Sequence, residues 1–136
     1  MTTVISQPKP ALVAIWRNGL IAAIVAAVIN AILFYIGAAA GGFPASVLTP
    51  MGVPITVMPV IIATVLGIVV GTLGYAILSR FTTNPNRWFT IVAIVVLLLM
   101  VYNPFTLVGA PVLMIALLQI MHLVAGGAAL YFLTRS

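Results

Sequence analysis

Hydrophobic positions along the chain come in four long runs, separated by short segments rich in glycine, proline and polar residues. The runs cover residues of about 14–40, 55–78, 88–103 and 108–133. A helix needs roughly 20 apolar residues to cross about 30 Å of hydrocarbon, and the third run is near the lower limit of that length. The pattern predicts an all-α integral membrane protein, with one four-helix transmembrane domain over 11–136 and a polar tail over 1–10.

The second and fourth runs end in similar stretches, which indicates an internal repeat. "GTLGYAILSR" (Gly71 to Arg80) aligns with "GGAALYFLTR" (Gly126 to Arg135). We therefore expect two tandem helical hairpins of the same orientation, related by an approximate two-fold axis along the membrane normal. Between the first two runs, Gly37 to Pro54 is apolar and contains three prolines. This segment is either a re-entrant element or a simple loop.

The composition strengthens the membrane prediction, because the chain is 65% hydrophobic and only 4% charged. Soluble domains are about one quarter charged. The five cations stand singly beside the ends of the runs: Lys9, Arg17, Arg80, Arg87 and Arg135. If the N-terminus is cytoplasmic, all five lie on the cytoplasmic side, as the positive-inside rule requires. We expect both termini in the cytoplasm, and scattered charges of this kind do not indicate nucleic-acid binding.

The residue types that are missing restrict the possible chemistry. The chain has no Asp, Glu or Cys. General acid–base pairs, hard-cation sites, carboxylate proton relays and thiolate chemistry all depend on those side chains. We therefore expect a protein that is not an enzyme.

Small residues recur at helical spacing within the runs and predict close helix packing. Helices in lipid associate through such surfaces, because burial from water does not drive them together. The candidate packing residues are Gly67, Gly71, Gly74, Ala22, Ala26, Gly126 and Gly127. They either pack within one chain or form a face for a second copy or another membrane protein.

A few polar side chains lie deep within the runs, at similar distances from the flanking arginines. They are Asn30, Thr64, Asn103, Gln119 and His122. At about 1.5 Å per residue, Asn30 lies roughly 20 Å along its helix from Arg17, and His122 lies equally far from Arg135. We expect a polar layer in the outer half of the bilayer. The plainest interpretation is interhelical hydrogen bonding, with each contact worth about 0.6–2 kcal/mol.

His122 also admits a functional interpretation, because a neutral imidazole is a common axial ligand. It could bind a haem iron or the magnesium of a chlorophyll-type pigment, with Gly126 and Gly127 leaving room for a flat macrocycle. Two further possibilities are a cavity in the polar layer for a lipid head group, quinone or solute, and a proton-coupled role for His122.

A resemblance follows from three short motifs. Arg17 before the first run, "SRFT" (Ser79 to Thr82) after the second, and "MHLVA" (Met121 to Ala125) in the fourth are similar to a family of small uncharacterised bacterial membrane proteins with four spans. The resemblance implies the four-helix fold and the bacterial inner membrane. It implies no activity and no catalytic residue.

Together these features favour a non-enzymatic accessory or structural subunit of a larger membrane complex. Its partners would be the lipid bilayer and other membrane subunits or a second copy. The missing catalytic side chains, the small-residue faces and a proline-containing tail that a partner would order all support this hypothesis. The first alternative is a pigment- or haem-binding protein with His122 as axial ligand, and the second is a small transporter or channel that uses the polar layer.

Overall fold

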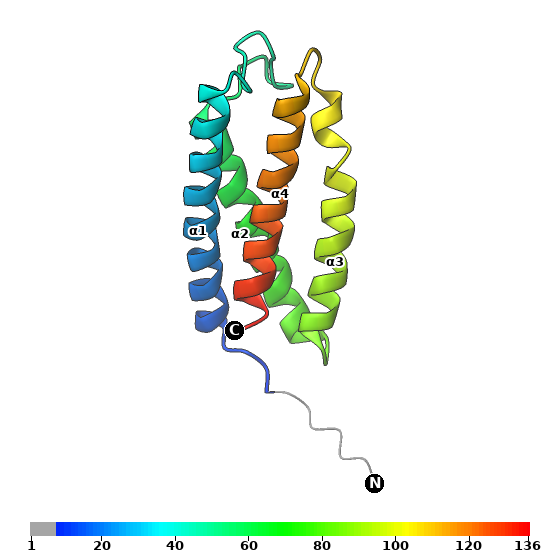
Figure 1. Ribbon diagram of the computed structural model, residues 1–136. Helices are drawn as coiled ribbons and strands as arrows, with labels where there is room; N and C mark the ends of the chain where they lie inside the picture. Colours follow the sequence, from blue (N-terminus) through cyan, green and yellow to red (C-terminus); the bar gives the residue numbers. More distant parts are fainter. Residues whose placement is uncertain (1–7) are drawn as a thin grey trace.

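The computed structural model describes residues 8–136, so most of the predicted tail lies outside the described residues. Within this range the chain forms four α-helices and one short 3₁₀ helix (Figure 1). They are α1 (Leu12–Ala39), α2 (Val57–Phe81), α3 (Pro85–Met100), η1 (Asn103–Thr106) and α4 (Val112–Leu133). Each of the four spans is long and apolar enough to cross a membrane, the third when η1 is counted with α3. The prediction of an all-α membrane protein with four spans is confirmed.

Capping residues and prolines mark the N-termini of α3 and α4. Asn84 precedes α3, and its side-chain oxygen accepts a hydrogen bond from the backbone N–H of Arg87 at 3.3 Å. Pro85 occupies the first position of α3, where a missing N–H costs nothing. Pro111 is the N-cap residue of α4, one position before the helix begins. The turn between α2 and α3 is therefore fixed by an N-cap and a proline.

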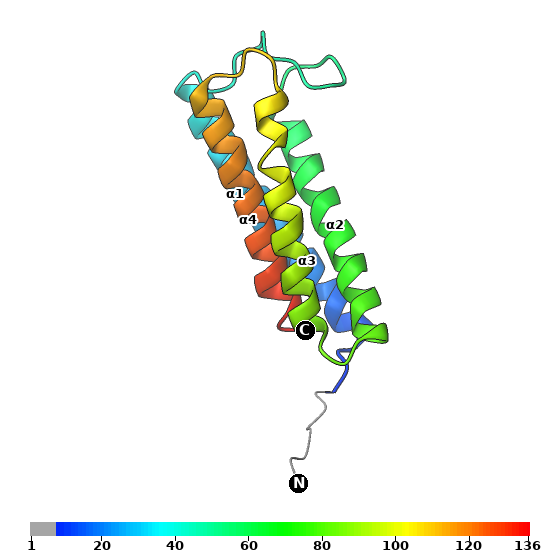
Figure 2. The same ribbon diagram turned by 90° about the vertical axis from the view of Figure 1, so that its right-hand side faces the viewer.

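The four helices do not contribute equally to the core. α1 packs along both α2 and α4, whereas α3 lies at the edge of the bundle beside α2 and α4 (Figures 1 and 2). Among the 16 residues of α3, all of them described, Phe89 alone is buried. The two predicted hairpins are thus present as antiparallel pairs, but the second is much more loosely packed than the first.

Small residues on α1 allow its close approach to α2 and α4. Ala22 and Ala26 are completely buried in the core. Gly19 faces Thr72 of α2, and a Cβ at Gly19 would lie 2.6 Å from Thr72 Cγ2 and even closer to its Oγ1. Any larger residue at position 19 would force α1 and α2 apart.

All five cations gather at one end of the bundle, where α1 and α3 begin and α2 and α4 end (Figure 1). We call this the basic end. At the opposite end, the segment between α1 and α2 lies beyond the helix ends and does not enter the bundle (Figures 1 and 2). It turns at Gly52, which has a φ of 78°, where the N–H of Thr49 donates to the carbonyl of Val53 at 2.8 Å. The segment is therefore a simple loop.

Candidate functional site

Asn30 is the most deeply buried polar side chain on α1, with 1% of its surface exposed. Its Nδ2 donates to Thr64 Oγ1 of α2 at 3.0 Å and to the carbonyl of Met121 of α4 at 3.3 Å. Thr64 Oγ1 in turn donates to the carbonyl of Val60 at 2.7 Å. One amide thereby connects the three core helices, in a medium where no water competes for the bonds.

This cluster leaves one acceptor unused. Asn30 Oδ1 is buried and has no hydrogen-bond partner within residues 8–136. A buried polar atom without a partner costs free energy. The two donor contacts of Nδ2 therefore stabilise the bundle by less than their number suggests.

The other members of the predicted polar layer lie apart from Asn30. Gln119 Nε2 donates to the carbonyl of Val101 at 2.6 Å and so connects α4 to the end of α3. Asn103 is exposed at the start of η1, where its carbonyl accepts a bond from Thr106 Oγ1 at 2.6 Å. The structure thus brings together Asn30 and Thr64 but leaves Gln119 and Asn103 at the edge near α3.

His122 is half-buried on α4, directly after the residue whose carbonyl binds Asn30. Its Nδ1 is buried without a hydrogen-bond partner in the described part of the chain. Gly126, one turn further along, faces Leu97 of α3, and a Cβ at Gly126 would lie 2.6 Å from Leu97 Cδ1. Gly127 faces open space. The room expected beside His122 is therefore partly filled by α3.

The predicted glycine face of α2 is mostly unoccupied. A Cβ at Gly67 or Gly74 would meet no heavy atom within 4 Å, apart from the helix backbone itself. At Gly71 it would meet only the ring of Phe89, at 3.9 Å. The face that includes Gly67 and Gly74 therefore does not serve close packing among residues 8–136.

A second polar network, at the basic end, was not predicted. Tyr75 OH donates to Asn86 Oδ1 at 2.6 Å, and Asn86 Nδ2 donates to the carbonyl of Thr134 at 3.0 Å. Asn18 Nδ2 donates to the carbonyl of Phe132 at 3.0 Å. These bonds connect the ends of all four helices at the level where the cations gather.

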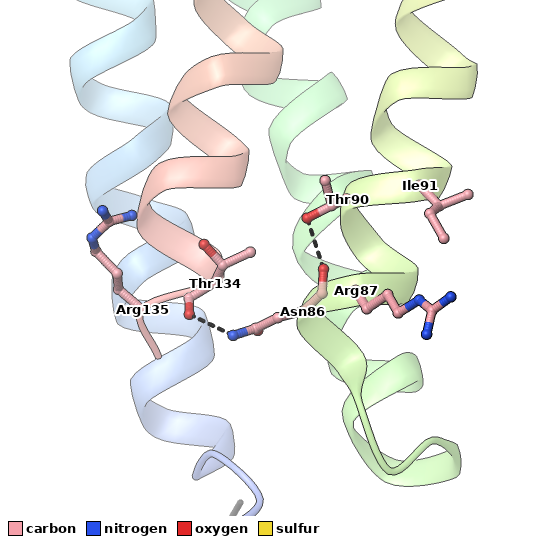
Figure 3. A pocket seen from close by; sticks show the side chains of 6 residues that line it. All are labelled: Asn86, Arg87, Thr90, Ile91, Thr134 and Arg135. Carbon is pink, nitrogen blue, oxygen red and sulfur yellow. Dashed lines mark hydrogen bonds between the residues drawn. The ribbon is translucent and has the colours of Figure 1, made fainter.

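An open pocket of about 700 Å³ lies beside this network, between the start of α3 and the end of α4 (Figure 3). It is lined by Asn86, Arg87, Thr90, Ile91, Thr134 and Arg135. A second pocket of about 450 Å³ shares Asn86, Thr134 and Arg135 and extends to Lys9. Asn86 and Thr134, which are joined by a hydrogen bond, line both pockets, and three of the five cations border them.

Comparison with known proteins gives a family but no activity. The model of a family of unknown function, DUF6069, matches residues 10–136. The chain belongs to this family. No curated protein and no solved structure matches the chain. Membership in DUF6069 agrees with the resemblance expected from the sequence, and any function must be argued from the chain's own residues.

The sequence did contain a signal for the basic-end network. Tyr75 lies near the end of the second run, Asn86 lies in the turn that follows it, and Asn18 directly follows Arg17. No network was predicted for these three residues, because spacing along one helix does not show which residues meet across helices.

Proposed function

We propose that this protein is a non-enzymatic accessory subunit of a larger membrane complex, and that a partner's transmembrane helix packs on α2 at Gly67 and Gly74. The observation that carries the proposal is the open space at both glycines. A small-residue face lets another helix backbone approach closely, and in lipid such an approach is a main source of association energy.

The position of α3 also supports this face of α2 as the partner-binding surface. α3 buries only Phe89 among its residues, so it covers α2 near the basic end and leaves Gly67 uncovered. Apolar side chains stand beside the glycines on α2: Leu66, Val70 and Leu73 are each at least half exposed. A glycine-lined groove between larger apolar residues is the shape that a neighbouring helix fits.

We further propose that the protein lies in the bacterial inner membrane with the basic end in the cytoplasm. Lys9, Arg17, Arg80, Arg87 and Arg135 at one end support this orientation through the positive-inside rule. Cysteine accessibility tests it, because the native chain has no cysteine. A cysteine introduced at Ser136 should react only with membrane-permeant reagents in intact cells, and one introduced at Ser46 should react with impermeant reagents as well.

The subunit proposal is tested by purifying the tagged full chain from its native membrane in mild detergent and quantifying co-purified proteins by mass spectrometry. We expect at least one membrane protein in a stoichiometric amount. The double variant Gly67→Leu/Gly74→Leu should reduce its recovery by about tenfold, which corresponds to about 1.4 kcal/mol of association energy.

The control is Ala116→Leu, which introduces a leucine at an exposed position of α4, outside the proposed surface on α2. It should leave recovery unchanged. Equal recovery from the double variant and the wild type would contradict the proposed surface. If only further copies of this chain are recovered, the protein forms a homo-oligomer and is not an accessory subunit.

The two alternatives have less support from the geometry. Leu97 fills the space beside Gly126 that a macrocycle near His122 would need. If a haem or chlorophyll-type pigment does bind, the purified protein should absorb visible light and lose that band in His122→Ala. A transporter or channel that uses the polar layer has less support because Asn30 and Gln119 contact different helices.

A further inference from the structure

The pocket between α3 and α4 at the basic end combines features that the subunit proposal does not use. From these features we propose that it binds the phosphate of an anionic phospholipid in the leaflet at that end, with Arg87 and Arg135 as the binding cations. The inference stands independently of the partner surface on α2.

The two arginines have no side-chain anion to neutralise them. The chain contains five Lys and Arg and no Asp or Glu, so every ion pair with a side-chain carboxylate is excluded. The guanidinium of Arg87 makes no hydrogen bond within residues 8–136, where only its backbone N–H bonds a side chain. Arg135 donates from Nη1 to the carbonyl of Tyr131 at 2.9 Å, and its Cζ lies 3.8 Å from the centre of the Tyr131 ring. A guanidinium has five N–H donors, so most remain available to a ligand.

The base of the pocket is held in place by neutral groups. Asn86 accepts from Tyr75 and donates to the carbonyl of Thr134, which fixes the start of α3 against the end of α4. Figure 3 shows this hydrogen bond between the two helices, with Arg87 and Arg135 on either side and their guanidinium groups turned outward. Both arginines are exposed, so a change of rotamer lets either one turn toward a bound anion.

The surroundings of the pocket favour a lipid over a free anion. Ile91 lines the pocket on the side of the membrane interior and is 42% exposed. Trp88 and Tyr131, both about half exposed, stand near the same level. Aromatic side chains prefer the depth of the lipid head groups. A ligand with a phosphate beside arginines and an acyl chain along the apolar surface of α3 matches this arrangement, and guanidinium groups bind phosphate bidentately.

The experiment uses the full chain in a zwitterionic detergent and measures lipid binding by native mass spectrometry. The probes are phosphatidylglycerol, phosphatidylcholine of the same acyl chains, and inorganic phosphate. We expect phosphatidylglycerol to bind preferentially. The variant Arg87→Gln/Arg135→Gln should weaken that binding by about tenfold or more, since each cation near a membrane surface contributes substantially to the attraction of anionic lipid.

The matched control is Arg17→Gln/Arg80→Gln, which removes the same charge at the same end but outside the pocket. This control should retain most of the binding. Equal losses in both double variants would overturn the proposal in favour of diffuse attraction by the basic end. Competition by millimolar inorganic phosphate would show that a free anion, and not a lipid, is the ligand. Equal binding of the two lipids by the wild type would overturn the site itself.

A further double variant controls for misfolding. Arg87→Lys/Arg135→Lys keeps both charges and the topology signal but removes the bidentate geometry. It should bind phosphatidylglycerol more weakly than the wild type and more strongly than the glutamine variant. Binding at the wild-type level would overturn the assignment of bidentate arginine contacts.

Discussion

Replacing Gly19 with alanine should destabilise the bundle by about 1–3 kcal/mol, the usual cost of overpacking a well-filled core. The added methyl would lie 2.6 Å from Thr72 Cγ2 and 3.0 Å from Thr72 Cβ. Rotation of the threonine cannot relieve the clash, because Thr72 Cβ itself belongs to it. α1 must therefore move away from α2 along one of its two extensive helix interfaces. The thermal unfolding midpoint of the full chain in detergent measures the loss.

Two further variants identify the cause. Gly67→Ala makes the same change in a helix where a Cβ meets nothing within 4 Å, so it should leave the stability of the isolated chain unchanged or slightly raised. Thr72→Ala removes two of the three clashing atoms and should restore part of the stability lost in Gly19→Ala. If Gly19→Ala proves as stable as Gly67→Ala, the close contact between α1 and α2 is not present in the folded protein.

Replacing Asn30 with aspartate should be the most damaging change at a polar position, costing about 3 kcal/mol. The donor Nδ2 serves Thr64 Oγ1 and the carbonyl of Met121. Thr64 has already given its proton to Val60, so both partners present oxygen atoms to the new carboxylate. A charge in the core would face two acceptors and no cation. Chemical unfolding of the full chain in detergent measures the difference.

The change Asn30→Leu separates charge from the loss of hydrogen bonds. It removes both donor contacts but also removes the unsatisfied Oδ1, so it should cost only about 1 kcal/mol. Asn103→Asp makes the aspartate change at an exposed residue and should have little effect. Equal damage from Asn30→Leu and Asn30→Asp would mean that the loss of the two Nδ2 hydrogen bonds, and not the buried charge, causes the destabilisation.

The sequence predicted the helices well because the bilayer leaves few choices. Every backbone N–H and C=O in hydrocarbon must be satisfied within its own segment, so a long apolar run such as Leu12–Ala39 forms a helix. Depth was also predictable, since a helix rises by a fixed amount per residue. Asn30 and Thr64 were expected near the same depth, and their side chains are 3.0 Å apart.

The sequence could not predict which helix faces which. The spans are apolar around most of their circumference, so no hydrophobic stripe marks the inner side of a helix. On α2 the inner side instead carries buried polar residues such as Thr64 and Thr72. Gly19 lies three residues before Ala22 on the buried face of α1, yet its spacing does not show that a Cβ there would clash with Thr72 of α2. Gly67 belongs to a recognisable glycine motif, yet it contacts nothing within the described chain. Which faces pack together depends on how well the surfaces of two helices fit each other, and these helices are distant in sequence.

The central position of α1 has a consequence for the order of assembly during synthesis. α1 packs against α2, the next helix made, and equally against α4, which emerges only after α3. The side of α1 that faces α4, which includes Gly37 opposite Leu117, therefore remains against lipid or the insertion machinery while α3 is made. Because α3 buries little, it does not compete for that side. The core closes when α4 inserts, and the bundle reaches its final stability only at that step.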